Sequence, residues 1–497
     1  MDAAFALART QAKPVFVYWG AAWCPPCNQV KATIFNRQDF IERSRAFVPV
    51  YVDGDSAGAQ KLGARFHVSG YPTMVLFNAG GAEVTRLPGE VDPARYAELL
   101  DLGMGATRPA KAVLADALAG GKDLTPNDWM LLAFYAFDTD QQQLVASDKL
   151  APTLARLAEL CPPAQAQTAM RLRLKSLAAR TEPPPAGDAA ARAASLSLLA
   201  LLNDRAASRE EADVLLNWPA EIVRSATARA TPERLQATKS LAATLQRFEA
   251  DPSLSRADRI QAVMGQVELA RIDMPDHRAA AASASHVPPP ALPPALLADV
   301  REQAARAARE ITDPFERQAV ITSAADLLER AGLSKESDDL LEANLGKSHS
   351  PYYLMSALAG NARRRGDNDV ALRWYRRAYE QSEGPATRLQ WGASYVGALV
   401  DLAPADEAAV EAAAMRVWND AASQSDAFYE RSGRSLQRLG SKLQEWSAGG
   451  AHAGSMRRLQ AALATLCGRA DRPDSELLAC KALLTAPPKA APRPGTA

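Results

Sequence analysis

The sequence predicts a two-part chain, with an α/β domain over residues 1–104 and a mostly α-helical, solenoid-like region after it. Three observations support this division. Short runs of β-branched and aromatic residues alternate with amphipathic segments as far as residue 104, which indicates strands alternating with helices. From residue 105 onward, alanine- and leucine-rich segments with helical spacing replace the strands almost completely. Small and apolar residues also recur every 34 positions after residue 320, which is typical of stacked helix pairs.

The elements of the first part follow from its apolar pattern and from the residues that interrupt it. The pattern predicts helices over residues 2–12, 25–44, 56–66 and 93–102. It predicts strands over residues 14–19, 47–53, 73–77 and 83–87, the last two as an antiparallel pair. The first strand is rich in β-branched and aromatic residues, so we expect it at the buried centre of a mixed sheet flanked by helices.

The helical part is divided by its prolines. The clusters over residues 183–185 and 288–294 cannot continue a helix, so we expect loops or hinges there. We predict four segments: a helical region over 105–285, a proline-rich hinge over 286–299, helical repeats over 300–485 and a disordered tail over 486–497.

The period of 34 residues resembles that of tetratricopeptide repeats. The first unit consists of Ile321, Ala324, Ala325, Leu328, Ser337 and Leu341. The same positions in the second unit are Met355, Leu358, Ala359, Ala362, Ala371 and Tyr375. An unrelated array of helical hairpins is the alternative, because alanine-rich sequences match small-residue positions by composition alone.

Length and charge limit the class of protein. At 497 residues the chain is too long for one hydrophobic core and suggests about three units. Its 57 basic residues equal its 57 acidic ones, so we expect no general attraction to nucleic acid or to an anionic membrane. No apolar segment approaches the roughly 20 residues that span a bilayer. The first five residues lack the basic start of a signal peptide, which taken literally indicates a cytoplasmic protein.

The most informative motif is Trp23-Cys24-Pro25-Pro26-Cys27, which follows the first strand and opens the predicted helix. Pro25 and Pro26 lie where helical N–H groups have no partner, so prolines are tolerated there. The unpaired N–H groups and the helix dipole favour a thiolate at Cys24. We therefore predict that Cys24 is the nucleophile of thiol–disulfide exchange and that Cys27 is the resolving thiol.

The alternative interpretation of this motif is a pair of cysteines that are buried or bind a metal. Zinc sites of the C-x-x-C type normally need a second pair, which Cys161, Cys467 and Cys480 do not supply. The histidines show no paired ligand spacing either, so no metal site is predicted. Cys467 and Cys480 would form a disulfide in an oxidising compartment or be buried as small hydrophobic residues, and the sequence leaves both possibilities open.

Residues 1–104 resemble the thioredoxin family, on the dithiol motif and on further segments. Ser69-Gly70-Tyr71-Pro72-Thr73 resembles the family's X-Pro loop, residues 78–81 its hairpin turn, and Gly89 the glycine after the returning strand. The resemblance implies a cis bond between Tyr71 and Pro72, lying against the disulfide. It also implies that the Tyr71 backbone pairs with a substrate strand. The residues implied to bind substrate or support the site are Trp23, Pro25, Pro26, Tyr71 and Pro72.

Two positions depart from the family's pattern. Tyr18 stands where thioredoxins carry a buried aspartate, and their partner lysine falls near Pro49. The resemblance implies that this aspartate would accept a proton from the resolving thiol. Proton transfer from Cys27 would therefore have to run through water or another group.

Two functions fit these expectations. The first is a thiol–disulfide oxidoreductase that acts on protein thiols and disulfides through a redox-active Cys24–Cys27 pair, with no other cofactor. Its helical region would bind clients or a redox partner. The second is a non-enzymatic scaffold in which the thioredoxin-like domain serves only for docking. The first function requires accessible sulfur atoms close to Pro72. The resemblance also favours a periplasmic over a cytoplasmic location.

Overall fold

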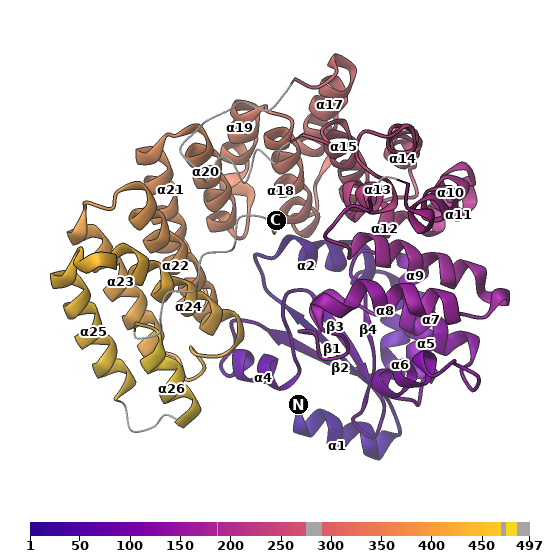
Figure 1. Ribbon diagram of the computed structural model, residues 1–497. Coiled ribbons are helices and arrows are strands. Elements are labelled where there is room, and N and C mark those ends of the chain that lie inside the picture. Colours follow the sequence, from indigo (N-terminus) through magenta and orange to yellow (C-terminus); the bar gives the residue numbers. More distant parts are fainter. Residues whose placement is uncertain (186, 275–290, 469–473, 485–497) are drawn as a thin grey trace. The chain divides into compact units, whose positions relative to one another are not determined.

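The computed structural model describes residues 1–185, 187–274, 291–468 and 474–484 (Figure 1). The chain forms two compact units, and each contains part of the first 104 residues. The first unit consists of residues 1–19, 24–51 and 71–340. The second unit consists of residues 20–23, 52–70 and 341–497.

The only sheet of the described residues has four strands in the order β2-β1-β3-β4 (Figure 1). They are β1 (Val15–Gly20), β2 (Val48–Asp53), β3 (Thr73–Phe77) and β4 (Glu83–Leu87). Strand β3 pairs antiparallel with both β1 and β4. Hydrogen bonds from Val48 N to Pro14 O and from Gly54 N to Gly20 O advance in the same direction, so β1 and β2 are parallel. The predicted mixed sheet is confirmed, and every residue of β1 is buried at its centre.

Helices flank this sheet as the sequence predicted. They are α1 (Asp2–Gln11), α2 (Pro25–Val30), α3 (Gln38–Arg43), α4 (Ala59–Arg65) and α5 (Pro93–Gly105). The single helix expected over 25–44 was wrong, because a π-helical turn (Lys31–Phe35) and a non-helical Arg37 separate α2 from α3. In one continuous helix, residues five apart would point about 140° away from each other. The break lets Phe35 and Phe40 stack at 4.7 Å and both contact Phe16.

Among the described residues, the remainder of the first unit is mostly helical. Its helices are α6 (Ala110–Leu118), α7 (Pro126–Ala133), α8 (Ser147–Leu160), α9 (Ala166–Ala178), α10 (Ala189–Asn203), α11 (Arg205–Glu210), α12 (Ala212–Asn217), α13 (Pro219–Ala226), α14 (Pro232–Ala250), α15 (Arg256–Ala270), α17 (Pro294–Glu310) and α18 (Pro314–Arg330). Residues 183–185 lie in the non-helical segment before α10, as expected of a proline cluster. Residues 286–290 of the expected hinge lie outside the described residues. Helix α17 begins at Pro294, so residues 294–299 of the hinge are helical, because proline is tolerated in a first turn.

The second unit holds most of the predicted repeats. Helix α19 (Ser334–Asn344) spans the boundary between the units. It is followed by α20 (Pro351–Arg365), α21 (Asn368–Gln381), α22 (Pro385–Leu402), α23 (Glu407–Ala422), α24 (Glu430–Trp446), α25 (Ala453–Cys467) and α26 (Asp474–Ala482). Successive helices pack in pairs, and the recurring alanines at 324, 359, 362 and 371 are almost fully buried. The tetratricopeptide resemblance itself stays a prediction, and the expected tail over 486–497 lies outside the described residues.

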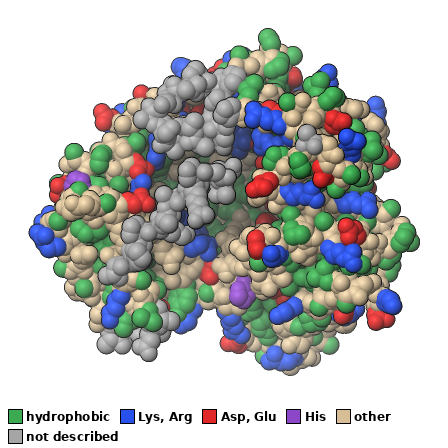
Figure 2. All heavy atoms as spheres, viewed as in Figure 1, with side chains coloured by type: hydrophobic (Ala, Val, Ile, Leu, Met, Phe, Trp, Pro, Cys, Tyr) green, Lys and Arg blue, Asp and Glu red, His purple; other side chains and the backbone are tan. Residues whose placement is uncertain are grey.

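The surface is mixed in charge. On the face shown in Figure 2, basic and acidic side chains are interspersed and do not gather into a large patch of one sign. Many charged side chains of the described residues form ion pairs, such as Arg43 with Asp101 and Arg301 with Glu336. Within the described ranges, no helix combines the length and the apolar character needed to cross a membrane.

Candidate active site

The two cysteines of the motif are joined at the start of α2. Cys24 and Cys27 form a disulfide with a Cα–Cα distance of 5.2 Å. Cys24 is the N-cap residue, and its sulfur accepts a hydrogen bond from the Cys27 backbone N–H at 3.1 Å. Pro25 and Pro26 occupy the first two helical positions, where no backbone donor is needed. Asn28 donates from its side chain to the Cys24 carbonyl at 2.8 Å, which fixes the turn from the other side.

The loop at residue 72 lies against this disulfide. The Tyr71–Pro72 peptide bond is cis, as the resemblance implied. The Cys24 sulfur lies 3.6 Å from the carbonyl oxygen of Tyr71. Gly89 approaches from a third segment, because a Cβ there would lie 3.3 Å from Pro72 Cγ. The Cys24 sulfur thus lies against the Tyr71–Pro72 loop, and Gly89 packs against that loop at Pro72.

The sulfur atoms are not accessible in this arrangement. Cys24 is 2% exposed and Cys27 is fully buried. The expectation of accessible sulfur atoms is therefore not met in the disulfide-bonded state. Exchange with a partner requires a movement that exposes Cys24.

Trp23 is held by helices of the second unit, to which it belongs. Its ring stacks on Tyr353 at 5.7 Å and meets Trp391 edge-on at 5.2 Å. The Arg431 guanidinium lies over the indole at 4.3 Å, within cation–π distance. The indole Nε1–H donates to the hydroxyl of Thr387 at 2.9 Å. Aromatic and charged groups from α20, α22 and α24 thus surround the residue that precedes the first cysteine.

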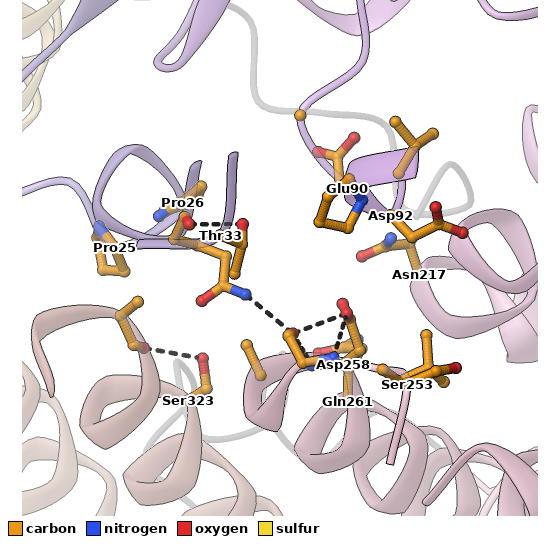
Figure 3. A pocket seen from close by; sticks show the side chains of 18 residues that line it. Pro25, Pro26, Thr33, Glu90, Asp92, Asn217, Ser253, Asp258, Gln261 and Ser323 are labelled. Atoms are coloured by element: carbon orange, nitrogen blue, oxygen red, sulfur yellow. Dashed lines mark hydrogen bonds between the residues drawn. The ribbon is translucent and has the colours of Figure 1, made fainter. Parts of the chain in front are cut away.

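A cavity of about 350 Å³ lies in the first unit beside the two prolines of the motif (Figure 3). Pro25 and Pro26 face Asp258 and Gln261 of α15 across this cavity. Gln29 crosses part of the gap, because its amide donates to the hydroxyl of Ser255 at 2.9 Å.

The cavity wall includes the carboxyl group of Glu90. Desolvation by the surrounding protein, together with the negative charges of the nearby Asp138 and Asp213, raises the pKa of Glu90 to about 7. The cavity nevertheless leaves much of this side chain exposed. No lysine or arginine of the described residues lines the cavity, so its wall carries negative charge above neutral pH.

The family's buried acid has no counterpart in this sheet. Tyr18 occupies that position in β1, where its ring stacks on Tyr51 at 5.4 Å and meets Phe35 edge-on at 4.9 Å. The departure seen in the sequence therefore reflects an aromatic cluster at this point of the core.

The other three cysteines differ in state. Cys467 and Cys480 form a disulfide with a Cα–Cα distance of 5.7 Å, which answers the question that the sequence left open. Cys161 is free and buried, and this burial raises the pKa of its thiol. The raised pKa disfavours the thiolate that exchange requires, so Cys161 is less suited to exchange than a thiol at a helix start.

Sequence reasoning missed the residues that surround Trp23. Thr387 and Arg431 are more than 360 positions away along the chain, and no motif marks them. The only available signal was the cluster of aromatic residues over 374–446, most of which are core. Trp391 belongs to that core and also contacts Trp23.

Comparisons with known proteins concern the first part of the chain. Residues 1–103 match the family described as a thioredoxin-like domain. Thiol:disulfide interchange protein DsbD 1 of Pseudomonas aeruginosa is 32% identical over 104 residues, which are 20% of this chain and 18% of that protein. The DsbD protein of Yersinia pestis is 31% identical over 99 residues, 19% of this chain and 16% of that protein. The chain thus spans less than a fifth of the length of these relatives.

Shorter relatives are matched over most of their length. Thioredoxin 1 of Chlorobaculum tepidum is 35% identical over 74 residues, which are 15% of this chain and 69% of that protein. The solution structure of a thioredoxin from Thermus thermophilus has 32% identity, with 20% of this chain and 80% of that chain covered and a TM-score of 0.19. Through its N-terminal domain, the chain belongs to the thioredoxin-like family.

Proposed function

We propose that the protein is a thiol–disulfide oxidoreductase that acts on protein thiols and disulfides through Cys24 and Cys27. The observation that carries this proposal is the Cys24–Cys27 disulfide at the start of α2, with the Tyr71 carbonyl 3.6 Å from the Cys24 sulfur. The names of the DsbD relatives, which describe thiol:disulfide interchange, support the same reaction.

The reaction proceeds by two sulfur-to-sulfur displacements. In the reduced protein, the Cys24 thiolate attacks a client disulfide, forms a mixed disulfide and releases one client thiolate. The Cys27 thiolate then attacks the Cys24 sulfur and releases the second client thiol. Two electrons and two protons pass to the client, and the Cys24–Cys27 disulfide forms. The reverse sequence oxidises a client dithiol, so the reduction potential of the pair sets the direction.

The remaining residues of the motif would support these steps. Pro25 and Pro26 keep the first turn free of competing donors, and the backbone of Tyr71 would pair with an extended client segment beside Pro72. The helical region would bind the client or a redox partner. The Cys467–Cys480 disulfide supports an oxidising compartment, such as the periplasm, over the cytoplasm.

Single cysteine variants test this proposal. Cys24→Ser should abolish the reduction of a model protein disulfide, while Cys27→Ser should accumulate mixed disulfides that are visible on non-reducing gels. Full turnover by Cys24→Ser would refute the assignment. A redox titration of the pair against glutathione then gives the direction of electron flow: a strongly reducing potential indicates a reductase, and an oxidising one indicates a disulfide donor or isomerase.

The burial of both sulfur atoms favours a second candidate, a non-enzymatic scaffold. In that case the Cys24→Ser/Cys27→Ser double variant would keep the wild-type phenotype, and removal of residues 105–497 would eliminate it. A matched thiol pair beside a cis-proline has no evident use in a pure scaffold, so we favour the enzyme.

A further inference from the structure

The indole of Trp23 ends a chain of three hydrogen-bonded groups. It donates to the Thr387 hydroxyl at 2.9 Å, and this hydroxyl donates to Asp55 Oδ2 at 2.6 Å. The Thr387 backbone N–H donates to the second oxygen, Asp55 Oδ1, at 2.7 Å. A hydroxyl has a single proton, so its donation to Asp55 directs its lone pairs toward the indole. All three residues belong to the second unit, and Thr387 is fully buried.

Asp55 is fixed in place from two sides. Thr387 lies in the first turn of α22, whose N-cap residue is Gly384, so the Asp55 carboxylate supplies the cap that this helix lacks. A Cβ at Gly384 would lie 2.6 Å from Asp55 Oδ1, so only glycine leaves room for the carboxylate. Burial raises the pKa of Asp55, and the hydrogen bonds from Thr387 and the charge of Arg431 oppose that rise.

The chain of hydrogen bonds acts on the residue bonded to Cys24. The indole cannot rotate without breaking its hydrogen bond to Thr387 and its contacts with Tyr353 and Trp391. Cys24 is 2% exposed, so its sulfur reaches a partner sulfur only after a local movement, and the peptide bond couples any movement of Cys24 to Trp23. The hydrogen bond and ring contacts of Trp23 oppose that movement.

We infer that Thr387 and Asp55 are positioning residues of the exchange site, which hold Trp23 and so restrain Cys24 in its buried position. This inference rests on the proposed function and adds that the site discriminates between reaction partners by their size. The restraint hinders polypeptide partners, which need a wide opening, more than it hinders small molecules. A client or redox partner that displaces the Trp23 indole from Thr387 would release Cys24.

The test measures how fast Cys24 reacts with two reagents of the same chemistry and different size. In a Cys27→Ala/Cys161→Ala background, Cys24 is the free thiol, and the labelling medium contains no reductant. The reagents are N-ethylmaleimide and a maleimide linked to polyethylene glycol, and mass spectrometry follows both. Changes in the thiolate fraction of Cys24 affect both rates equally and cancel in their ratio.

Thr387→Val keeps the shape of the side chain but removes the hydroxyl. The polyethylene glycol maleimide should then react about fivefold faster, as expected for the loss of one hydrogen bond. The N-ethylmaleimide rate should stay within about twofold, so the ratio of the two rates rises. Thr387→Ser retains the hydroxyl and should restore the wild-type ratio. If Thr387→Val folds poorly, Trp23→Phe breaks the same hydrogen bond from the other end and should raise the ratio likewise.

A ratio that is unchanged in both variants would overturn the inference. So would an equal acceleration of both reagents, because general loosening of the fold exposes Cys24 to any reagent. Labelling does not depend on turnover, so its outcome is separate from that of the proposed function. The proposed function fails if the reduced wild-type protein does not exchange with any disulfide.

Discussion

The backbone N–H of Gln60 donates a hydrogen bond to Asp426, which lies 366 positions later in the chain, at 2.9 Å. Gln60 is in the first turn of α4, whose N-cap residue is a glycine without a side chain. In return, the side-chain oxygen of Gln60 accepts a hydrogen bond from the backbone N–H of Arg431, in the first turn of α24, at 3.0 Å. Two helices from distant parts of the sequence thus satisfy each other's first turns.

Asp426→Ala should destabilise the protein by about 1 kcal/mol, the usual cost of losing an N-cap acceptor. Urea unfolding of the full chain measures this loss. Asp426→Asn keeps an acceptor oxygen and should stay close to wild type. Equal stability of Asp426→Ala and wild type would show that water replaces the carboxylate without cost.

A fragment of residues 1–104 should fold less well than the same residues do in the full chain. It loses Asp426 and Arg431 around α4, and it loses Thr387 beside Asp55 and Trp23. Hydrogen exchange should therefore be faster for residues 52–70 of the fragment, while β1 and β3 keep most of their protection. Identical protection in both forms would contradict the dependence on the helical region.

Stability should fall with rising pH between about 4.5 and 7 because of one buried carboxyl group. Glu211 is 2% exposed and shares the Arg171 guanidinium with Asp213. Burial raises the pKa of Glu211 from 4.5 to about 7. The folded protein therefore keeps a proton that the unfolded chain releases, so this contribution is complete below pH 4.5 and is lost as pH rises to 7.

The magnitude of this effect should be on the order of 1–3 kcal/mol. Urea unfolding at pH 5 and pH 7.5 measures it as the difference between wild type and Glu211→Gln, which cannot titrate. Glu182→Gln alters an exposed glutamate and serves as the control. Parallel pH profiles for wild type and Glu211→Gln would show that Glu211 is ionised throughout this range.

Glu90 should favour small disulfides that carry positive charge. Its carboxyl lines the cavity beside Pro25 and Pro26, and it ionises near pH 7. At pH 8, Glu90→Gln should slow reaction with cystamine by about two- to fivefold, the range of a partly solvated ion pair. Reaction with the neutral hydroxyethyl disulfide should not change. Stopped-flow rates for both reagents check this, and equal slowing of the two would exclude a charge effect.

The sequence predicted the local features of the site and missed the distant ones. Cys24, Cys27 and Pro72 lie in short motifs whose chemistry depends on neighbouring residues, so their arrangement could be expected. Thr387 and Asp426 are ordinary helix-end residues, and only the tertiary structure gives them partners in the first 104 residues. The break at residues 31–37 was also missed, because it arises from the contacts of Phe35 and Phe40 with Phe16 and not from a helix-breaking residue.

Residues 20–23 and 52–70 of the thioredoxin-like domain belong to the second unit, together with the helices after residue 340. A domain can be exchanged by genetic recombination when it is joined to the rest of the chain at its two ends only. In this domain, two internal stretches also belong to the second unit. A grafted oxidoreductase domain would have to bring its own counterparts of Trp23, Asp55 and Gln60. The two parts of the chain are therefore expected to diverge together in evolution, as a single inherited piece.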